Sequence, residues 1–313
     1  MKAPLLRAAA LGLGGLLLAP WLGPAIDSDS APFILWELRW PRAVLGGLVG
    51  ASLAASGAAY QVVLENPLAT PSTMGTTAGA ALGALAILVL APAHAGAMGV
   101  ALGAFAGASV VSLGIAALAS HRGLRTEELL LAGVAVMLGA GAATTGLQLQ
   151  ADAAATLASV RWSLGSLSLV GWERPLGMLP VTALGLAILL AQGHALQAMV
   201  AGAPRAQTQG VDVVRVRTTV LLTGSLLVGT CVALTGPIAF VGLIVPHLVR
   251  RLGVGGGPRR LVPVSAGVGL GFLPLADGLA RWCLPARDLP VGVVMAMLGA
   301  PTLLMLLLSQ RRR

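Results

Sequence analysis

The stretch that decides the fold reads RWPRAVLGGLVGASLAASGAAYQVVLENPLATPSTMGTTAGAALG and runs from Arg39 to Gly83. A Trp-Pro corner with two arginines opens a long run of small, mostly apolar residues. That run stops at a compact polar segment, residues 65–71, and a second glycine-rich apolar run follows. Within a lipid bilayer, irregular backbone is tolerated only where protein or a water-filled path covers it. The stretch therefore indicates a membrane protein with a pathway through it.

Composition assigns the whole chain to the same class. Of its 313 residues, 57% are hydrophobic and 10% are charged, whereas soluble domains carry roughly 25% charged residues. The mean hydropathy is +0.89. The apolar stretches lack the alternating pattern of outer-membrane barrel strands. We therefore expect an all-α polytopic membrane protein that forms a single transmembrane domain over residues 1–313.

The apolar stretches predict the individual helices, since a spanning helix needs about 20 apolar residues. They lie near residues 5–22, 43–64, 76–91, 95–119, 129–150, 175–192, 218–236, 240–250, 261–284 and 290–309. The eighth is short and contains Pro246, so hydropathy alone leaves nine or ten helices open. The first stretch ends in a poor cleavage site, and we interpret it as a retained helix, not a signal peptide.

The distribution of positive charge favours ten helices. With the N-terminus in the cytoplasm, most basic residues fall on the cytoplasmic side, as the positive-inside rule requires. The opposite side holds only Arg39, Arg42, Arg161, Arg174, Arg281 and Arg287. This distribution of basic residues predicts a multi-pass protein with ten helices and both termini in the cytoplasm.

Two glycine stripes recur at four-residue spacing, a pattern that lets helix backbones approach closely in lipid. They predict tight helix packing, with a pore-lining role as the alternative. The stripes consist of Gly75, Gly79 and Gly83, and of Gly99, Gly103 and Gly107.

Several other functions are excluded or weakened by the residues present. The single lysine, Lys2, lies in no glycine-rich loop, so the chain has no P-loop for nucleotide. The net charge of +9 comes with only 4% aromatic residues, and the arginines lie between apolar runs, so we expect contact with membrane lipid and no nucleic acid. The four histidines lack metal-ligand spacing, and we interpret Cys231 and Cys283 as buried thiols. We expect no metal or cofactor on this chain.

The motifs of the opening stretch resemble the FecCD family, the permease subunits of binding-protein-dependent ABC importers for iron–siderophores, haem and cobalamin. That family's pattern is an Arg-x-Pro-Arg corner, a Ser-Gly helix end, Asn-Pro-Leu-Ala and a Gly-Ala run. The matching residues here are 39–42, 56–57, 66–69 and 79–80, and further matches lie at 130–135, 162–167, 236–242, 246–247, 276–281, 289–293 and 299–301. The resemblance covers roughly residues 36 to 308.

The resemblance implies a type II ABC importer permease with ten helices in each subunit. It implies a dimer, which we expect to be a homodimer, two ATPase subunits that hold ATP and Mg²⁺, and a periplasmic substrate-binding protein. The location would be the bacterial inner membrane. For the cargo we expect a ferric siderophore first and haem second, on family prevalence, with cobalamin as the alternative.

Three arginines match family positions that dock the binding protein: Arg39, Arg42 and Arg281. Guanidinium groups bind carboxylates bidentately, which suits an acidic partner surface. The alternative is that they anchor helix ends at lipid headgroups. For Arg281, pairing with Asp277 on one helix face is a further alternative.

Two short segments match the family's cytoplasmic gates. Asn66 and Leu68 flank Pro67 in the polar segment, where Pro67 and Pro71 bracket a short hinge and remove backbone donors. A helix C-terminal cap is the alternative role for Asn66. Thr126 and Glu127 match a second constriction, although the family usually has a small hydroxyl residue in place of Glu127.

Residues 201–212 match the position of the coupling helices that contact the ATPase. The family often has an acid after the first glycine, where this chain has Ala203. The expected contact residues are Ala201, Gly202, Ala203, Arg205, Gly210 and Val211.

Two other classes of protein compete with this interpretation. An ion-coupled secondary transporter needs ionisable groups within its membrane helices, and Asp277 is the one acid that we place well inside a spanning run. An intramembrane enzyme needs a catalytic constellation, and the helices contain no His-Glu-x-x-His motif or paired acids.

Overall fold

The computed structural model describes residues 3–23, 30–91, 96–121, 126–149, 160, 162–168, 171–253, 257–283 and 289–310. Within these ranges every regular element is a helix, which confirms the all-α fold class. The elements, in chain order, are α1 (Ala3–Leu18), the 3-10 helix η1 (Ala19–Trp21), α2 (Ala31–Phe33), the π-helix η2 (Ile34–Arg39), α3 (Trp40–Val63), α4 (Thr76–Leu90), α5 (Ala97–His121), α6 (Thr126–Gln148), α8 (Glu173–Ala191), α9 (Gly193–Met199), α10 (Ala203–Thr208), α11 (Val213–Thr235), α12 (Val241–Arg251), α13 (Pro258–Cys283) and α14 (Val291–Gln310).

A helix lies at each of the ten predicted stretches, and the bounds differ by a few residues. In the described part of the chain, six helices are long and apolar enough to span a membrane, and three further apolar helices are shorter. The remaining predicted helix, the eighth in chain order, is α12, which has 11 residues and contains Pro246. The sequence did not predict η2, which extends α3 toward its N-terminus, or the short helix α9.

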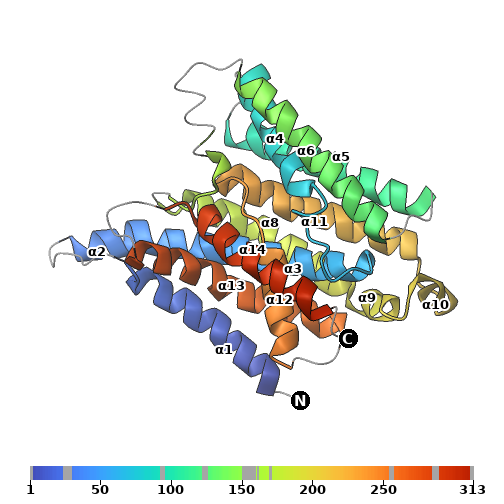
Figure 1. The fold of residues 1–313 in the computed structure, drawn as a ribbon. Coiled ribbons are helices and arrows are strands. Elements are labelled where there is room, and N and C mark those ends of the chain that lie inside the picture. The colour runs from blue at the N-terminus through green and yellow to red at the C-terminus, as the bar shows by residue number, and fades with distance from the viewer. Residues whose placement is uncertain are drawn as a thin grey trace.

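Helix α3 lies at the centre of the bundle, and nearly all of its residues are buried. It packs against α13, α11, α12 and α8, while α1 lies against α13 and α5 against α4 and α11 (Figure 1). The glycines, alanines and serines of α3 allow this close packing, because small side chains let neighbouring helix backbones approach each other. A Cβ atom at Gly50 would overlap the carbonyl oxygen of Gly269 in α13.

The glycine stripes of α4 and α5 face each other. A Cβ atom at Gly83 would overlap the carbonyl oxygen of Gly103, and one at Gly107 would overlap the carbonyl oxygen of Gly79. The packing interpretation is therefore confirmed for these four residues.

Replacing Gly107 by valine is expected to separate α4 from α5, because the new side chain meets backbone that cannot move aside. Overpacking of this kind typically costs about 1–3 kcal/mol, so the unfolding temperature in detergent should fall by several degrees. The matched control is Gly114→Val in the same helix, since a Cβ atom there has nothing within 4 Å. Equal unfolding temperatures for the two variants would contradict the packing role.

The bundle has two ends with different chemistry. The arginine end contains Arg39, Arg42 and Arg281, at the C-terminal ends of α1 and α13 and the N-terminal end of α3. The loop end contains residues 64–75, α9 and α10, together with the start of α1 and the end of α14 (Figure 1).

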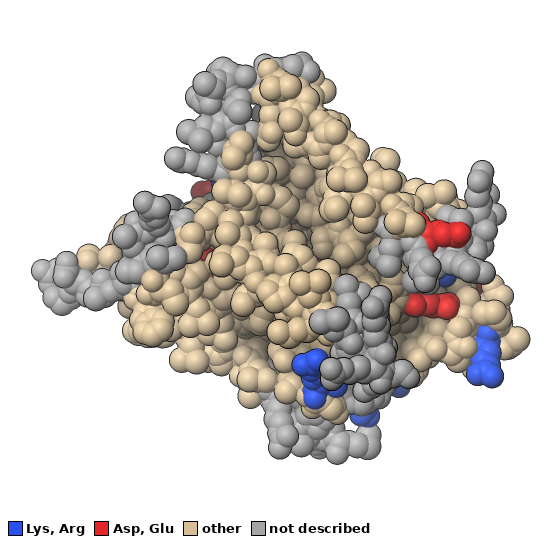
Figure 2. Space-filling model, in the orientation of Figure 1, with Lys and Arg blue, Asp and Glu red and all other residues tan. Residues whose placement is uncertain are grey.

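On the face seen in Figure 2, the described surface between the two ends is apolar. Figure 2 shows a broad uncharged face with the described charged residues toward its edges. Large side chains such as Leu102, Val110 and Leu131 are 58%, 72% and 68% exposed. A continuous apolar surface of this size is typical of a protein that contacts membrane lipid.

Candidate functional site

At the arginine end, three helix termini bring the predicted docking residues together. Arg39 is the last residue of η2, Arg42 lies in the first turn of α3, and Arg281 lies in the last turn of α13. Pro41 suits the start of α3, because a missing N–H costs nothing in a first helical turn. Asp277 lies one turn before Arg281 on α13.

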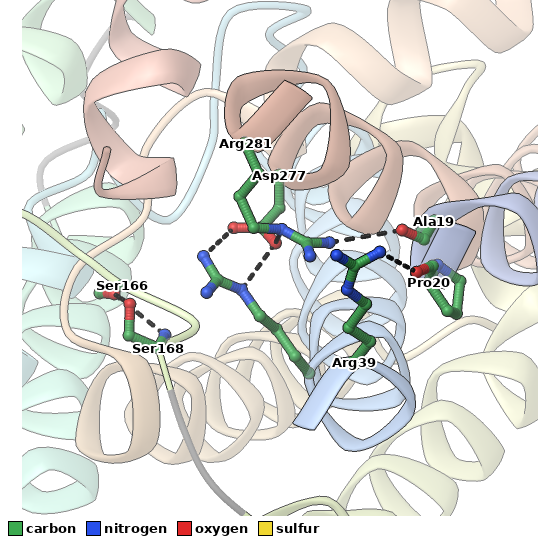
Figure 3. Close-up of polar contacts among 8 residues, drawn as sticks. Ala19, Pro20, Arg39, Ser166, Ser168, Asp277 and Arg281 are labelled. Carbon is green, nitrogen blue, oxygen red and sulfur yellow. Dashed lines mark hydrogen bonds and ion pairs between the residues drawn. The ribbon is translucent and has the colours of Figure 1, made fainter. Parts of the chain in front are cut away.

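Two of the three arginines, Arg42 and Arg281, contact the carboxylate of Asp277. Arg39 lies on the far side of Arg281 from this carboxylate and points toward Pro20 (Figure 3). Arg42 donates two hydrogen bonds to it, Nε to Oδ2 and Nη2 to Oδ1, each at 2.8 Å. Arg281 Nε lies 3.3 Å from Oδ2 as an ion pair. Both Arg39 and Arg281 also bond the end of the first helix: Arg39 Nη1 donates to Pro20 O at 3.2 Å, and Arg281 Nη2 donates to Ala19 O at 3.3 Å.

This cluster is buried within the subunit. The side chains of Arg42, Arg281 and Asp277 are 11%, 10% and 2% exposed, and Arg39 is 8% exposed. The predicted Arg281–Asp277 pair is present, but the sequence did not predict the stronger Arg42–Asp277 pair, which joins residues 235 positions apart. Removing one partner of a buried pair typically costs about 3–5 kcal/mol. The cluster therefore ties α1, α3 and α13 together at this end.

The same geometry accounts for the acid within the bundle. Asp277 accepts bonds from Arg42 and lies beside Arg281, so it is held as a paired carboxylate. A proton relay needs an acid that can exchange its proton with a pathway. A structural ion pair therefore explains Asp277, the one acid that had supported the secondary-transporter alternative.

All six tryptophans lie near the arginine end. Trp36 of η2 and Trp172 before α8 are in contact, with ring centroids 5.8 Å apart, and Trp172 Nε1 donates to Trp36 O at 3.1 Å. The full set is Trp21, Trp36, Trp40, Trp162, Trp172 and Trp282. Tryptophan is enriched at membrane interfaces and, with arginine, at protein interfaces, so this end combines features of both.

At the loop end, α3 terminates in a Schellman motif. Glu65 adopts the left-handed conformation with φ 51°, its N–H donates to Val62 O at 3.1 Å, and the N–H of Asn66 donates to Gln61 O at 3.0 Å. Asn66 is buried, and its Oδ1 accepts the N–H of Leu68 at 2.9 Å. Asn66 thus closes both the helix end and the following turn, in agreement with the capping alternative.

The polar segment continues as a tightly bonded loop. Thr73 Oγ1 accepts the N–H of Thr70 at 2.9 Å and donates to Leu68 O at 3.1 Å. The loop packs on α6, because the space beside Gly133 is filled by the backbone of Thr73 and Met74. The loop is therefore covered by protein on this side, as irregular backbone in a membrane protein requires.

The second predicted gate is only partly described. Thr126 and Glu127 are the first two residues of α6, and their side chains lie outside the described residues. The elements of the two gates do touch, through the contact of the loop with Gly133.

The predicted coupling segment forms a short helix between two turns. Gly202 and Gly210, on either side of α10, have φ 94° and 80°, a conformation that favours glycine. Val211 N–H returns to Ala206 O at 3.1 Å, so the segment folds back on itself. Arg205 lies within α10, whereas Ala201 precedes it.

Two hydrogen bonds join the coupling segment and its flank to the end of α3. Glu65 Oε1 accepts the N–H of Ala203 at 3.3 Å, and Arg217 Nε of α11 donates to Val63 O at 3.1 Å. The structure therefore connects the first gate with the coupling segment, although they lie more than 130 residues apart in sequence.

A buried polar cluster lies between the two ends. Tyr60 Oη donates to Leu221 O at 3.1 Å and lies 3.2 Å from Ser112 Oγ. Thr76 Oγ1 and Ser225 Oγ lie 3.0 and 2.8 Å from the same Ser112 oxygen. The cluster joins α3, α4, α5 and α11, and it is the kind of interhelical hydrogen bonding that stabilises membrane bundles.

Two further expectations can be compared with the structure. In the described part of the chain, no group of three His, Cys, Asp or Glu side chains could hold a metal ion. Both cysteines are free thiols; Cys231 is buried, but Cys283 is exposed, so the prediction of a buried thiol is wrong for Cys283. Cys283 is the last residue of α13 and follows the exposed Trp282, at the arginine end of the bundle.

Comparison with known proteins identifies the chain's family. A family model described as "FecCD transport family" matches residues 8–309. A cobalamin import system permease protein, BtuC, of Halobacterium salinarum is 41% identical over 91% of this chain and 76% of its own length. A vitamin B12 import system permease protein of Vibrio cholerae is 38% identical over 92% of this chain and 86% of its own.

A solved structure supports the same assignment. It is an inward-facing conformation of a metal-chelate type ABC transporter, with a TM-score of 0.85 and 26% identity, and the match covers 99% of this chain and 100% of the other. The family match, the relatives and the helical architecture all agree with the predicted resemblance. The chain therefore belongs to the FecCD transport family, as a membrane-embedded permease subunit of an ABC importer.

Proposed function

We propose that this permease forms a homodimer in the bacterial inner membrane and imports a metal chelate delivered by a periplasmic binding protein. Two partner ATPases hydrolyse ATP, as in ABC importers generally, and this chain provides the path. The observation that carries the proposal is the bond network that joins the Asn66 loop to the segment around Ala203. Such a network lets an ATPase-driven movement reach a gate.

The orientation follows from charge. The described arginines of the loop end outnumber those of the arginine end, and the positive-inside rule then assigns the loop end to the cytoplasm. The loop-end set is Arg205, Arg215, Arg217, Arg250, Arg251, Arg259 and Arg260. In this orientation the tryptophan-rich arginine end faces the periplasm, and both termini lie in the cytoplasm.

Each site then has a role in the cycle. Arg39, Arg42 and Arg281 are 8–11% exposed and bonded within the subunit. Their binding to carboxylates on the two lobes of the binding protein therefore requires these internal contacts to open. Asn66 and Leu68 close the cytoplasmic mouth, together with Thr126 and Glu127. Residues 201–212 contact the ATPase through Ala201, Gly202, Ala203, Arg205, Gly210 and Val211. ATP binding shifts the dimer between inward-open and outward-open states by favouring one of them.

For the cargo we propose cobalamin, itself a cobalt chelate, ahead of ferric siderophores and haem. The two relatives described above are named as permeases of cobalamin (vitamin B12) import systems. The expectation of a siderophore came from family prevalence and from no residue of this chain. The metal-chelate transporter of similar structure is compatible with each of these substrates.

Substrate preference can be measured by uptake into proteoliposomes that contain the assembled importer. We expect labelled cobalamin to accumulate at least about tenfold faster than a ferric siderophore or haem. A chelate that lacks the hydrogen-bonding groups of the transported substrate leaves polar groups of the protein unpaired. Each chelate is supplied together with the binding protein that belongs to this importer. Faster accumulation of the siderophore would contradict the cobalamin assignment and would restore the order expected from the family.

A further inference from the structure

The residue at the end of α3 carries an unexpected side chain. Glu65 occupies the left-handed C′ position of the Schellman motif, with φ 51°, where glycine is the usual residue. A left-handed backbone brings the Cβ atom of an L-residue close to the next carbonyl oxygen, which strains it. Glycine would make the same backbone bonds without that strain, so the glutamate side chain needs another explanation.

The side chain reaches out of the loop to a distant segment. Its Oε1 accepts the N–H of Ala203 at 3.3 Å, across 138 residues of sequence. The next residues after Glu65 are Asn66 to Leu68, the gate. One side chain thus joins the gate loop to the coupling segment directly.

A second bond holds the same turn of α3 from the other flank of the coupling segment. Arg217 Nε in α11 donates to Val63 O at 3.1 Å. The end of α3 is therefore held both at Ala203 and in the first turns of α11. A displacement of the coupling segment would reach the gate loop through these contacts.

We propose that Glu65 is a positioning residue that transmits movement of the coupling segment, residues 201–212, to the gate at Asn66–Leu68. Strained backbone positions persist where the surrounding structure requires them, often at functional sites. The proposal rests on the proposed function, because it assumes that residues 201–212 contact the ATPase.

The test follows the gate itself, through a cysteine at Leu68→Cys in a chain whose Cys231 and Cys283 are replaced by serine. Its labelling rate by a soluble maleimide is measured in the assembled importer, with and without a non-hydrolysable ATP analogue. We expect nucleotide to change this rate in the reference chain. In Glu65→Gly the nucleotide-dependent change should shrink at least threefold, whereas Glu65→Gln, which keeps the Oε1 acceptor, should stay within about twofold.

Stability separates this role from a structural one. Glu65→Gly relieves the left-handed strain, so its unfolding temperature should stay equal or rise by about 1–2 °C. A residue with a merely structural role would lose stability and gating together. A loss of gating with unchanged or higher stability is the signature of a transmitting contact.

Ala203→Pro is the matched variant on the other side of the bond. It removes the N–H donor at the first position of α10, where proline is well tolerated, and it leaves Glu65 in place. We expect the same loss as in Glu65→Gly, and the double variant should lose no more than either single one. Additive losses, or a full nucleotide response in both single variants, would overturn the proposal.

The outcomes also separate this inference from the proposed function. If nucleotide does not change labelling of the reference chain, the gate is not ATP-driven, and the proposed function and the inference both fail. If the reference chain responds and Glu65→Gly responds equally, the inference alone fails.

Discussion

Replacing Arg39 and Arg42 together by glutamate is expected to abolish association with the binding protein and, with it, uptake. The change turns attraction for an acidic partner surface into repulsion, at a site where bidentate guanidinium–carboxylate pairs would form. Truncating one partner of a buried interfacial charge pair costs about 2–5 kcal/mol, so reversal of two charges should weaken binding at least about 100-fold. Binding is measured with the permease in nanodiscs at low ionic strength.

The internal pair between Arg42 and Asp277 demands a folding control. Glutamate at position 42 would face the carboxylate of Asp277, whose two hydrogen bonds from Arg42 are lost. The control is the charge swap Arg42→Glu with Asp277→Arg, which keeps one pair of opposite charges in the cluster. We expect this variant to assemble with the ATPase as the unaltered chain does but to bind the binding protein at least about tenfold more weakly.

Two results would argue against the docking role. Normal binding by the Arg39→Glu, Arg42→Glu variant would show that the partner does not contact these residues. Normal binding by the charge swap would show that Arg42 acts only through the fold, as a tie between α3 and α13. In the second case Arg39 would remain to be tested alone, by Arg39→Gln against the same partner.

Hydropathy predicted the helices well because each depends on a local property. A run of about 20 apolar residues is long enough to cross a bilayer whatever its neighbours are. The glycine stripes of α4 and α5 were equally local, since four-residue spacing aligns Gly79 and Gly83 on one helix face. Their contact with Gly103 and Gly107 follows once the two helices are adjacent.

Pairing at the arginine end could be predicted only in part. The Arg281–Asp277 pair lies within one helix, at a spacing that puts both side chains on the same face. The Arg42–Asp277 pair depends on how α3 packs against α13, and no sequence pattern specifies that. The tryptophans had a usable signal, because the predicted topology already assigns all six to one side of the membrane.

The loop end shows a different limit. Asn66 and the prolines around it indicated a turn, and the turn is present. Glu65 gave no signal, since its left-handed backbone and its bond to Ala203 depend on tertiary structure. The sequence has Ala203 where the family often has an acid, and in the structure the carboxylate of Glu65 accepts a hydrogen bond from the backbone at that position.

The central claim, that this chain is the pathway of an ATP-driven importer, is tested most directly by reconstituted uptake. The permease and its ATPase are placed in liposomes, and uptake of labelled cobalamin is measured with and without Mg²⁺-ATP and with and without the binding protein. A hydrolysis-deficient ATPase serves as the control.

We predict uptake only when both Mg²⁺-ATP and the binding protein are present, with a rate at least about 100-fold lower when either is omitted or the ATPase is inactive. An effect of that size corresponds to about 2.7 kcal/mol in the barrier. Uptake at the full rate without ATP, driven by an ion gradient across the liposome membrane, would contradict the account.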